Sequence, residues 1–235
     1  MEKNIHKAEA RGKADHGWLK SRHTFSFANY HNPKMMGFNT LRVINDDIVH
    51  PAKGFGTHPH RDMEIISIPL RGSLRHEDSM GNKYVIKNGE VQVMSAGTGI
   101  THSEFNNSND EDVNFLQIWV MPKNIGVKPN YEQKHFSKES RKNKLQLVVS
   151  PDGRSESNKI NQDAFFTLVD LDKEKEIAYN LYNKGNGVYI FIIEGSLDVS
   201  GVELTKRDGL TLENIEKLAL TAKSSCEILI MEVPA

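Results

Sequence analysis

Two pairs of side chains in the first half of the chain have the types and the spacing of metal ligands. His58 and His60 form one pair, and His102 and Glu104 form the other. In an extended strand, residues two apart point to the same face and lie about 6.6 Å apart, so each pair presents two donors in one direction. Two such pairs on facing strands of a small barrel would converge on one point. Three neutral imidazoles and one carboxylate form a mixed nitrogen and oxygen site that suits a divalent first-row metal.

Each pair also has a simpler interpretation. A single His-x-His pair on a surface strand commonly binds nothing, and His102 with Glu104 could form only a hydrogen-bonded pair at the mouth of a barrel. Glycine-rich segments stand beside both pairs and permit backbone angles that would turn the side chains inward. Because two matched pairs occur in this context, the sequence favours the metal site.

Glu64 is a competing carboxylate, since it shares the parity of His58 and His60. Full extension would place it about 13 Å beyond His60, so it could ligate the same ion only if the strand bends or bulges. Glu104 needs no such distortion. We therefore rank Glu104 first and regard Glu64 as an outer or substitute ligand.

The remaining histidines and the cysteine narrow the chemistry further. All ten histidines lie at or before His135, so imidazole chemistry is confined to the first half. His76 lies between the two pairs, as a pocket residue or a structural histidine, and His23 and His31 are weaker candidates. Cys226 is the only cysteine, which excludes an intrachain disulfide and a thiolate metal cage. We interpret it as a buried strand residue.

The elements that must position these side chains are short apolar segments rich in Val, Ile, Leu and Phe. Most end in Gly, Pro, Asn or Asp, which is typical of strands joined by turns in an antiparallel sandwich or barrel. A short helix or loop is expected only near Ser137–Asn143, Asp163 and Glu174–Glu176. The predicted strands are Thr40–Ile44, Glu64–Pro69, Tyr84–Lys87, Val91–Met94, Asn114–Met121, Leu145–Ser150, Phe165–Asp170, Gly187–Ile193, Ser196–Ser200 and Ile228–Val233.

A polar segment and two internal echoes indicate two similar β units. Tyr131–Lys144 is crowded with charged and amide side chains, and we interpret it as the connection. Leu70–Leu74 resembles Ile193–Leu197, each a strand, a glycine turn and a second strand. Asn88-Gly89-Glu90 is similarly echoed by Arg207-Asp208-Gly209. Chance reuse of hairpins is the alternative, but we expect two barrels, at residues 1–135 and 136–235, with the metal in the first.

Composition excludes several classes of protein. The 235 residues include 30 Lys plus Arg and 31 Asp plus Glu, with a formal net charge of -1, which gives no reason to expect nucleic-acid binding. No apolar run approaches the roughly 18 to 20 residues that span a bilayer. The charged first fifteen residues do not resemble a signal peptide. We expect a soluble, cytoplasmic, globular protein that acts as a monomer.

The two ligand pairs and their surroundings resemble the two sequence motifs of the cupin superfamily, and more narrowly the pirin family. The likeness is closest to the bacterial members described as quercetin 2,3-dioxygenases. It is strong over the first half and rests on general pattern in the second. The segments that carry it are His23–Ala28, Leu41–Asp47, Thr57–Glu64, His76–Gly81 and Met94–Glu104.

This resemblance implies a bicupin, with two tandem antiparallel β-barrels (double-stranded β-helices), few short helices and a metal ion only in the first barrel. It implies that His58, His60, His102 and Glu104 hold one divalent ion, the same set that strand parity favours. Iron is the metal usually associated with the family, so Fe(II) is expected, and Ni, Mn, Co, Cu or Zn could replace it.

The resemblance also implies an activity, in which O2 cleaves the ring of a flavonol such as quercetin and carbon monoxide is released. Such a site must leave one or two coordination positions open. Glu104 is our candidate for the general base that accepts the substrate hydroxyl proton, with Glu64 as the reserve. A flat substrate could pack against any of Phe25, Phe27, Phe38 and Phe55. We assign none of them to the site.

Two other functions are compatible with the same ligands. Pirin-like proteins include non-enzymatic, metal- or redox-dependent regulators that bind a protein partner, and nothing in the sequence excludes this role. Sugar or isomerase chemistry on a cupin scaffold would need further acid/base residues in the pocket. His76 is the only additional histidine that lies between the two ligand pairs in the sequence.

Overall fold

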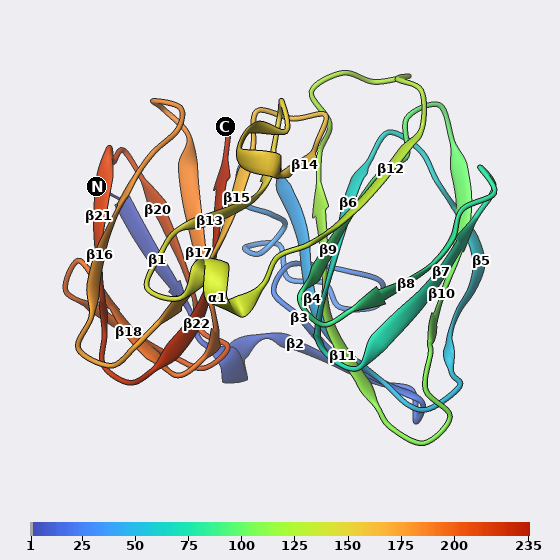
Figure 1. The fold of residues 1–235 in the computed structure, drawn as a ribbon, viewed down its shortest axis with the longest axis horizontal. Coiled ribbons are helices and arrows are strands. Elements are labelled where there is room, and N and C mark those ends of the chain that lie inside the picture. The colour runs from blue at the N-terminus through green and yellow to red at the C-terminus, as the bar shows by residue number, and fades with distance from the viewer. Residues whose placement is uncertain (1) are drawn as a thin grey trace. The chain divides into compact units, whose positions relative to one another are not determined.

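The computed structural model describes residues 2–235, and almost all of the regular structure is β (Figure 1). The only helices among these residues are the four-residue α1 (Lys138–Arg141) and two 3-10 turns, η1 (Ala8–Ala10) and η2 (Arg154–Glu156). The prediction of an all-β protein with few short helices is therefore confirmed. No helix in this range is long and apolar enough to cross a membrane.

Ten strands overlap the ten apolar segments expected from sequence, each within a few residues. These segments could be predicted because their apolar side chains are buried whichever strand becomes their neighbour. These strands are β4 (Leu41–Val49), β6 (Glu64–Arg71), β8 (Lys83–Lys87), β9 (Glu90–Ser95), β11 (Val113–Val120), β13 (Gln146–Ser150), β15 (Phe165–Leu171), β17 (Gly187–Glu194), β18 (Ser196–Val199) and β22 (Cys226–Val233).

The other strands are shorter or more polar, and most lack an apolar run that would have marked them. Their partners supply the missing stabilisation through ladder hydrogen bonds. They are β1 (Glu2–His6), β2 (Gly12–Asp15), β3 (Leu19–His23), β5 (Gly54–His60), β7 (Ser73–Asp78), β10 (Ile100–Asn106), β12 (Asn130–His135), β14 (Asn158–Lys159), β16 (Glu176–Asn180), β19 (Val202–Thr205), β20 (Gly209–Glu213) and β21 (Lys217–Ala222).

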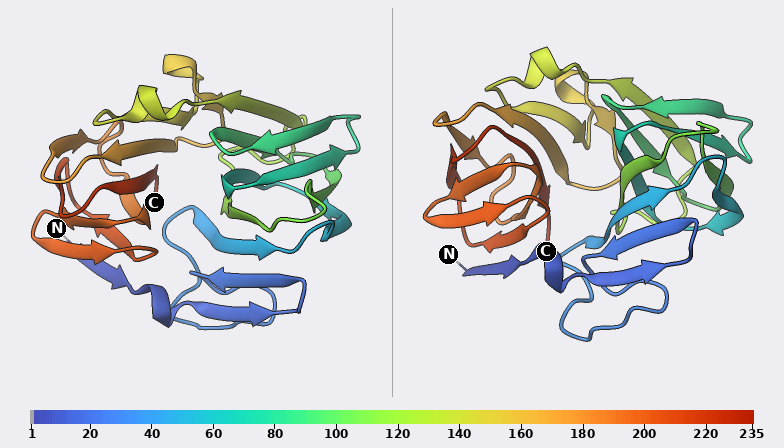
Figure 2. Two further views of the ribbon diagram at one scale, coloured as in Figure 1. Left: turned by 60° about the horizontal axis from the view of Figure 1, so that its bottom comes forward. Right: turned by 90° about the horizontal axis from the view of Figure 1, so that it is seen from below.

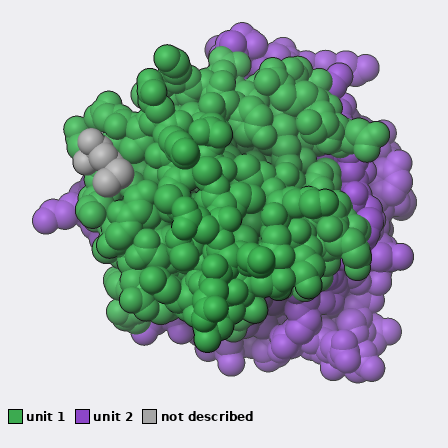
Figure 3. Space-filling model, turned by 60° about the vertical axis from the view of Figure 1, so that its left-hand side comes forward, with its two compact units in different colours: residues 1–11, 136–157, 163–235 green, residues 12–135, 158–162 purple. Residues whose placement is uncertain are grey.

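The chain forms two compact units, coloured separately in Figure 3. The N-terminal unit comprises Gly12–His135 and Asn158–Gln162. The C-terminal unit comprises the segment ending at Arg11, Phe136–Ser157 and Asp163–Ala235. The predicted ranges, 1–135 and 136–235, differ from these units in two short segments. The segment ending at Arg11 belongs to the C-terminal unit, where β1 pairs with β20, and Asn158–Gln162 belong to the N-terminal unit. Figure 2 shows the dark blue β1 beside the orange strands of the C-terminal unit. A local pattern contains no information about such a partner.

Each unit consists of a large and a small antiparallel sheet with matching strand orders. In the N-terminal unit the orders are β12-β9-β6-β11-β4-β3-β2 and β5-β10-β7-β8. In the C-terminal unit they are β1-β20-β17-β22-β15-β13 and β16-β21-β18-β19. The internal echoes fall at matching places, since Gly72 follows β6 and Gly195 follows β17, both with positive φ (73° and 81°). The expectation of two similar β units is confirmed by this repetition.

The interiors of the two units differ. The C-terminal unit contains one large cluster of buried apolar side chains, among them Val188, Leu218, Leu220 and Ile230. Cys226 belongs to this cluster, so its interpretation as a buried strand residue is confirmed. In the N-terminal unit, smaller apolar clusters around Phe115 and around Ile65 leave room for buried polar groups.

Candidate metal centre

The predicted ligand pairs lie on two strands of the small sheet of the N-terminal unit. His58 and His60 are on β5, and His102 and Glu104 are on β10. Along β10 the buried residues alternate, so His102 and Glu104 face the interior together, as strand parity predicted. The expectation of facing strands was wrong, because β5 and β10 are hydrogen-bonded neighbours with His58 directly opposite His102. A β-bulge between His102 and Glu104 shifts the register there.

The three histidines of these strands form a compact group. The ring centroids are 4.5 Å apart for His58 and His102, 4.8 Å for His58 and His60, and 4.9 Å for His60 and His102. Their potential ligand atoms all lie within 4.8 Å of one another. A second group with the same spacing contains His102, Glu104 and His76. His102 is common to both groups, and it links the three histidines to the carboxylate.

The protonation of these imidazoles suits metal binding. Burial and the neighbouring His58 lower the pKa of His60 to about 4. Burial and the neighbouring histidines lower the pKa of His102 to about 2. Both rings are therefore neutral at pH 7, which is the form that donates a lone pair to a metal.

Two nitrogen atoms show how the histidines fit an ion. His58 Nδ1 lies 2.8 Å from the carbonyl oxygen of Gly56, and a hydrogen bond donated there leaves the lone pair on Nε2. His102 Nε2 is buried and has no hydrogen-bond partner. A buried nitrogen without a partner is costly unless an ion or water meets it. The donor set therefore fits a divalent cation.

Glu104 is held rigidly inside the unit. Ser67 Oγ donates to its Oε1 at 3.1 Å, and Gln117 Nε2 donates to its Oε2 at 2.7 Å. Burial raises its pKa to about 7, and the charge of Asp47 adds to this effect. The carboxyl group can thus exchange a proton near neutral pH.

Glu64 lies away from this group, on β6 in the large sheet. Ser95 Oγ and the Asn161 backbone N–H donate to its Oε2 at 2.6 and 3.1 Å, and Oε1 has no partner. Burial raises the pKa of Glu64 to about 7. It belongs to neither ligand group of the described residues, so the structure supports ranking Glu104 above it.

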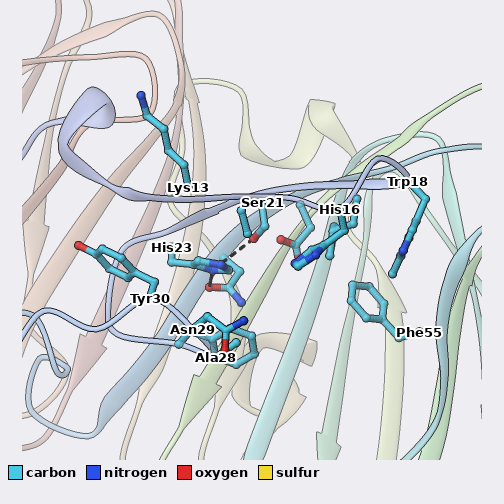
Figure 4. A pocket seen from close by; sticks show the side chains of 14 residues that line it. Lys13, His16, Trp18, Ser21, His23, Ala28, Asn29, Tyr30 and Phe55 are labelled. Atoms are coloured by element: carbon cyan, nitrogen blue, oxygen red, sulfur yellow. Dashed lines mark hydrogen bonds between the residues drawn. The ribbon is translucent and has the colours of Figure 1, made fainter.

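A cavity of about 520 Å³ lies beside the histidines in the N-terminal unit (Figure 4). Figure 4 shows Tyr30 at one side and Trp18 with Phe55 at the other, with His23 and Ser21 between them. A smaller hollow of about 60 Å³ is lined by all four predicted ligands. The two share four lining residues, so the cavity adjoins the hollow at the ligand group. These shared residues are Phe27, Asn45, Asp47 and Phe55.

Comparison with known proteins identifies the family. A family model described as Pirin matches residues 4–120, and one described as Quercetinase C-terminal cupin domain matches residues 147–233. The chain belongs to the pirin family. The bicupin prediction is confirmed, since the second half matches a cupin domain and the N-terminal unit repeats its strand order.

Two similar pirin-family proteins cover nearly the whole chain. Quercetin 2,3-dioxygenase of Escherichia coli (strain K12) is 45% identical over 230 residues, 98% of each protein. The pirin-like protein of Caulobacter vibrioides is 38% identical over 222 residues, 94% of this chain and 95% of that protein. Among solved structures, bacterial pirin YhhW from Escherichia coli in complex with nickel(II) matches with a TM-score of 0.94 and 43% identity, covering 99% of each chain.

Several pocket residues of this pirin were missed by sequence reasoning. Asp47 lines both the cavity and the hollow, and its Oδ1 has no partner. Burial raises its pKa to about 7, against a hydrogen bond from Ser21. Asn45, Asp46 and Asp47 interrupt a strand that is otherwise apolar, and this run of polar residues was the available signal.

The earlier aromatic and histidine candidates divide clearly. Phe27 and Phe55 line the cavity, whereas Phe25 is a core residue. Phe38 does not line this cavity, and its backbone forms an isolated β-bridge with Leu41. His23 lines the cavity, where its Nδ1 lies 2.8 Å from Asn45 Oδ1. His31 is exposed.

Proposed function

We propose that this protein is a metal-dependent dioxygenase that cleaves a quercetin-like flavonol with O2, at a mononuclear site formed by His58, His60, His102 and Glu104. The observation that carries the proposal is the partnerless Nε2 of the neutral His102, which lies against His58 and His60 and next to an aromatic-lined cavity. Two comparisons support it: the related Escherichia coli protein is named quercetin 2,3-dioxygenase, and a similar bacterial pirin binds nickel(II).

The size and lining of the cavity suit a flat aromatic substrate. A volume of about 520 Å³ lies within the usual range for small-molecule sites. Trp18, Phe27, Tyr30 and Phe55 offer aromatic surfaces on which rings can pack. Asp47 offers a buried carboxylate oxygen without a partner to accept a hydrogen bond from a substrate hydroxyl.

The residues of the site have distinct roles in this proposal. A bound divalent metal would acidify the substrate hydroxyl and allow electrons to pass between substrate and O2. Glu104 accepts the hydroxyl proton on a carboxylate oxygen, in the hollow that adjoins the substrate cavity. The aromatic walls exclude water while the ring is attacked. We propose Fe(II) as the native metal, with Ni, Mn, Co, Cu or Zn as substitutes, in a cytoplasmic monomer.

The test is anaerobic reconstitution with Fe(II), followed by oxygen uptake and carbon monoxide release in the presence of quercetin. We expect substrate-dependent uptake that His58→Ala and His102→Ala abolish. Absence of uptake with Fe, Mn, Ni, Co and Cu would contradict the dioxygenase assignment. The alternative, a metal- or redox-dependent regulator with a protein partner, would then take its place and would be tested by capture of partners from native cytosol.

A further inference from the structure

Two residues of β7 with buried side chains lie beside the ligand strand β10, in the same sheet. In the register of these strands His76 is opposite Glu104, and Asp78 is opposite His102. The side chains of His76 and Asp78 are fully inaccessible to solvent. Their polar atoms must therefore find partners inside the protein.

The partners form a line that ends at His102. His76 Nε2 lies 3.1 Å from Asp78 Oδ2, and His76 Nδ1 lies 3.5 Å from His102 Nδ1. Burial alone would raise the pKa of Asp78, but hydrogen bonds from Asn82 and His76 hold it below its usual value. Asp78 is therefore an ionised acceptor. Both nitrogen atoms of the His76 ring are therefore engaged, one by the Asp78 carboxylate and the other by the ring of His102.

These contacts are satisfied by one arrangement of protons. The Asp78 carboxylate can only accept, so His76 Nε2 donates to it. His76 Nδ1 is then an acceptor, and the neighbouring Nδ1 of His102 must donate to it. The proton of neutral His102 is thereby placed on Nδ1, and its lone pair is on Nε2. This is the buried nitrogen that has no partner in the structure.

Asp78 is itself firmly held, which gives the line a fixed end. The backbone N–H groups of Met80 and Asn82 donate to Oδ1 at 2.9 and 3.1 Å, and Asn82 Nδ2 donates to Oδ2 at 2.8 Å. The ring of Tyr131 packs against His76 with centroids 4.8 Å apart. The orientation of His76 is thus determined by hydrogen bonds and by packing.

We propose that Asp78 and His76 form a hydrogen-bonded relay that fixes the tautomer and orientation of His102 and strengthens Nε2 as a metal donor. The inference rests on the metal site of the proposed function. His58 offers a contrast, because its Nδ1 is next to a neutral carbonyl group, that of Gly56. Behind His102, by contrast, a carboxylate acts through the intervening ring of His76.

His76 could instead be a ligand, since its potential ligand atom also lies close to those of His102 and Glu104. Because Asp78 engages His76 Nε2, the Nδ1 atom of His76 would have to face the ion and could not accept from His102. His102 would then keep a buried N–H without an acceptor, on Nδ1 or on Nε2. The relay leaves no such donor, so it accounts for the structure better.

The test titrates the metal-free protein with Co2+ in competition with a chelator of known affinity, at fixed pH. It also records the visible absorption bands of the bound ion, which report its ligands. Asp78→Asn, His76→Leu and His76→Gln are compared with the wild type. His6→Leu removes another buried histidine, hydrogen-bonded to Tyr189 in the C-terminal unit, and is the matched control. Thermal unfolding of each metal-free variant verifies its fold. If His76→Leu does not fold, the comparison is made with His76→Gln instead.

We expect one Co2+ per chain in every variant. Asp78→Asn and His76→Leu bind it roughly 10- to 100-fold more weakly, which is the usual cost of losing such an outer partner, and with shifted bands. His76→Gln loses less, because its amide oxygen can still accept from His102 Nδ1. His6→Leu behaves as the wild type.

Unchanged affinity and bands in Asp78→Asn and His76→Leu would overturn the relay. Loss of a nitrogen ligand in His76→Leu, with Asp78→Asn unchanged, would also overturn it and would make His76 a ligand. A wild-type protein that binds no Co2+ would instead refute the proposed metal site, so the two failures are distinguishable.

Discussion

The two units of this pirin repeat one strand order and use it differently. In the small sheet of the N-terminal unit, β5 and β10 present His58, His102 and Glu104. In the C-terminal unit, β16 and β21 hold the matching places in the order and present Tyr179 and Leu218, which are paired across the strands and buried. The same arrangement of strands can therefore form a metal site where polar side chains take the place of apolar ones at the interior positions.

Buried carboxylates show the same difference. Glu232 in the C-terminal unit accepts from Tyr179 Oη, two backbone N–H groups and Asn186 Nδ2, at 2.8 to 3.0 Å. Glu64 in the N-terminal unit accepts two hydrogen bonds on one oxygen, and the other oxygen has no partner. Saturated hydrogen bonding stabilises a fold, whereas incomplete hydrogen bonding leaves groups available to an ion, a proton or a substrate.

The largest expected effect is the loss of the metal in His102→Ala. This residue belongs to both candidate ligand groups, so its removal dismantles both. We expect metal content near zero, measured by elemental analysis of protein purified without oxygen. Full stoichiometry in this variant would contradict the assignment and would remove the main distinction between the units.

The matched change in the other unit is Leu220→Ala, on β21. Leu220 is fully buried in the apolar cluster, so the cavity and the lost hydrophobic contacts should lower the free energy of unfolding by roughly 2 to 5 kcal/mol. Urea denaturation measures this. Metal content should stay at the wild-type level, and its loss would mean that the C-terminal unit contributes to the site.

The pH dependence of stability should differ between wild type and Glu64→Gln. Burial raises the pKa of Glu64 from 4.5 to about 7, so between these values the folded protein binds a proton that the unfolded chain has released. Wild-type stability therefore falls relative to the variant as pH rises from about 4.5 to 7, by on the order of 3 kcal/mol. Denaturation of metal-free protein across this range is the measurement. A constant difference would show that Glu64 ionises normally.

The smallest effects are expected at the paired turn glycines. Gly72→Ala should cost about 1 kcal/mol, since its φ of 73° is left-handed and the nearest atom to an added Cβ, Asp112 O, is 3.3 Å away. Gly195→Ala should cost more, because its Cβ would collide with Ser225 O. Thermal unfolding of both variants gives the comparison. Equal losses would show that the two turns tolerate a side chain alike.

The sequence predicted the strands with strong apolar runs, the repetition of the units and the faces of β5 and β10. Parity was sufficient for His102 and Glu104 because alternation is a local property of a strand. It could not show that β5 and β10 are neighbours, since partner choice depends on contacts far apart in the sequence. For the same reason, strand parity could not show that Asp47 on β4 lines the cavity beside the histidines. It also could not show that His76 lies opposite Glu104.

The pairing of β1 with β20 has a practical consequence for work on separate halves of the molecule. β1 covers β20 from Glu2 opposite Glu213 to His6 opposite Gly209. A fragment that starts at residue 136 would lack this cover, and the backbone groups of β20 would form an open sheet edge. Open edges recruit strands from other molecules. Such a fragment would therefore be prone to aggregation, and fusing the first eleven residues to it would restore its solubility.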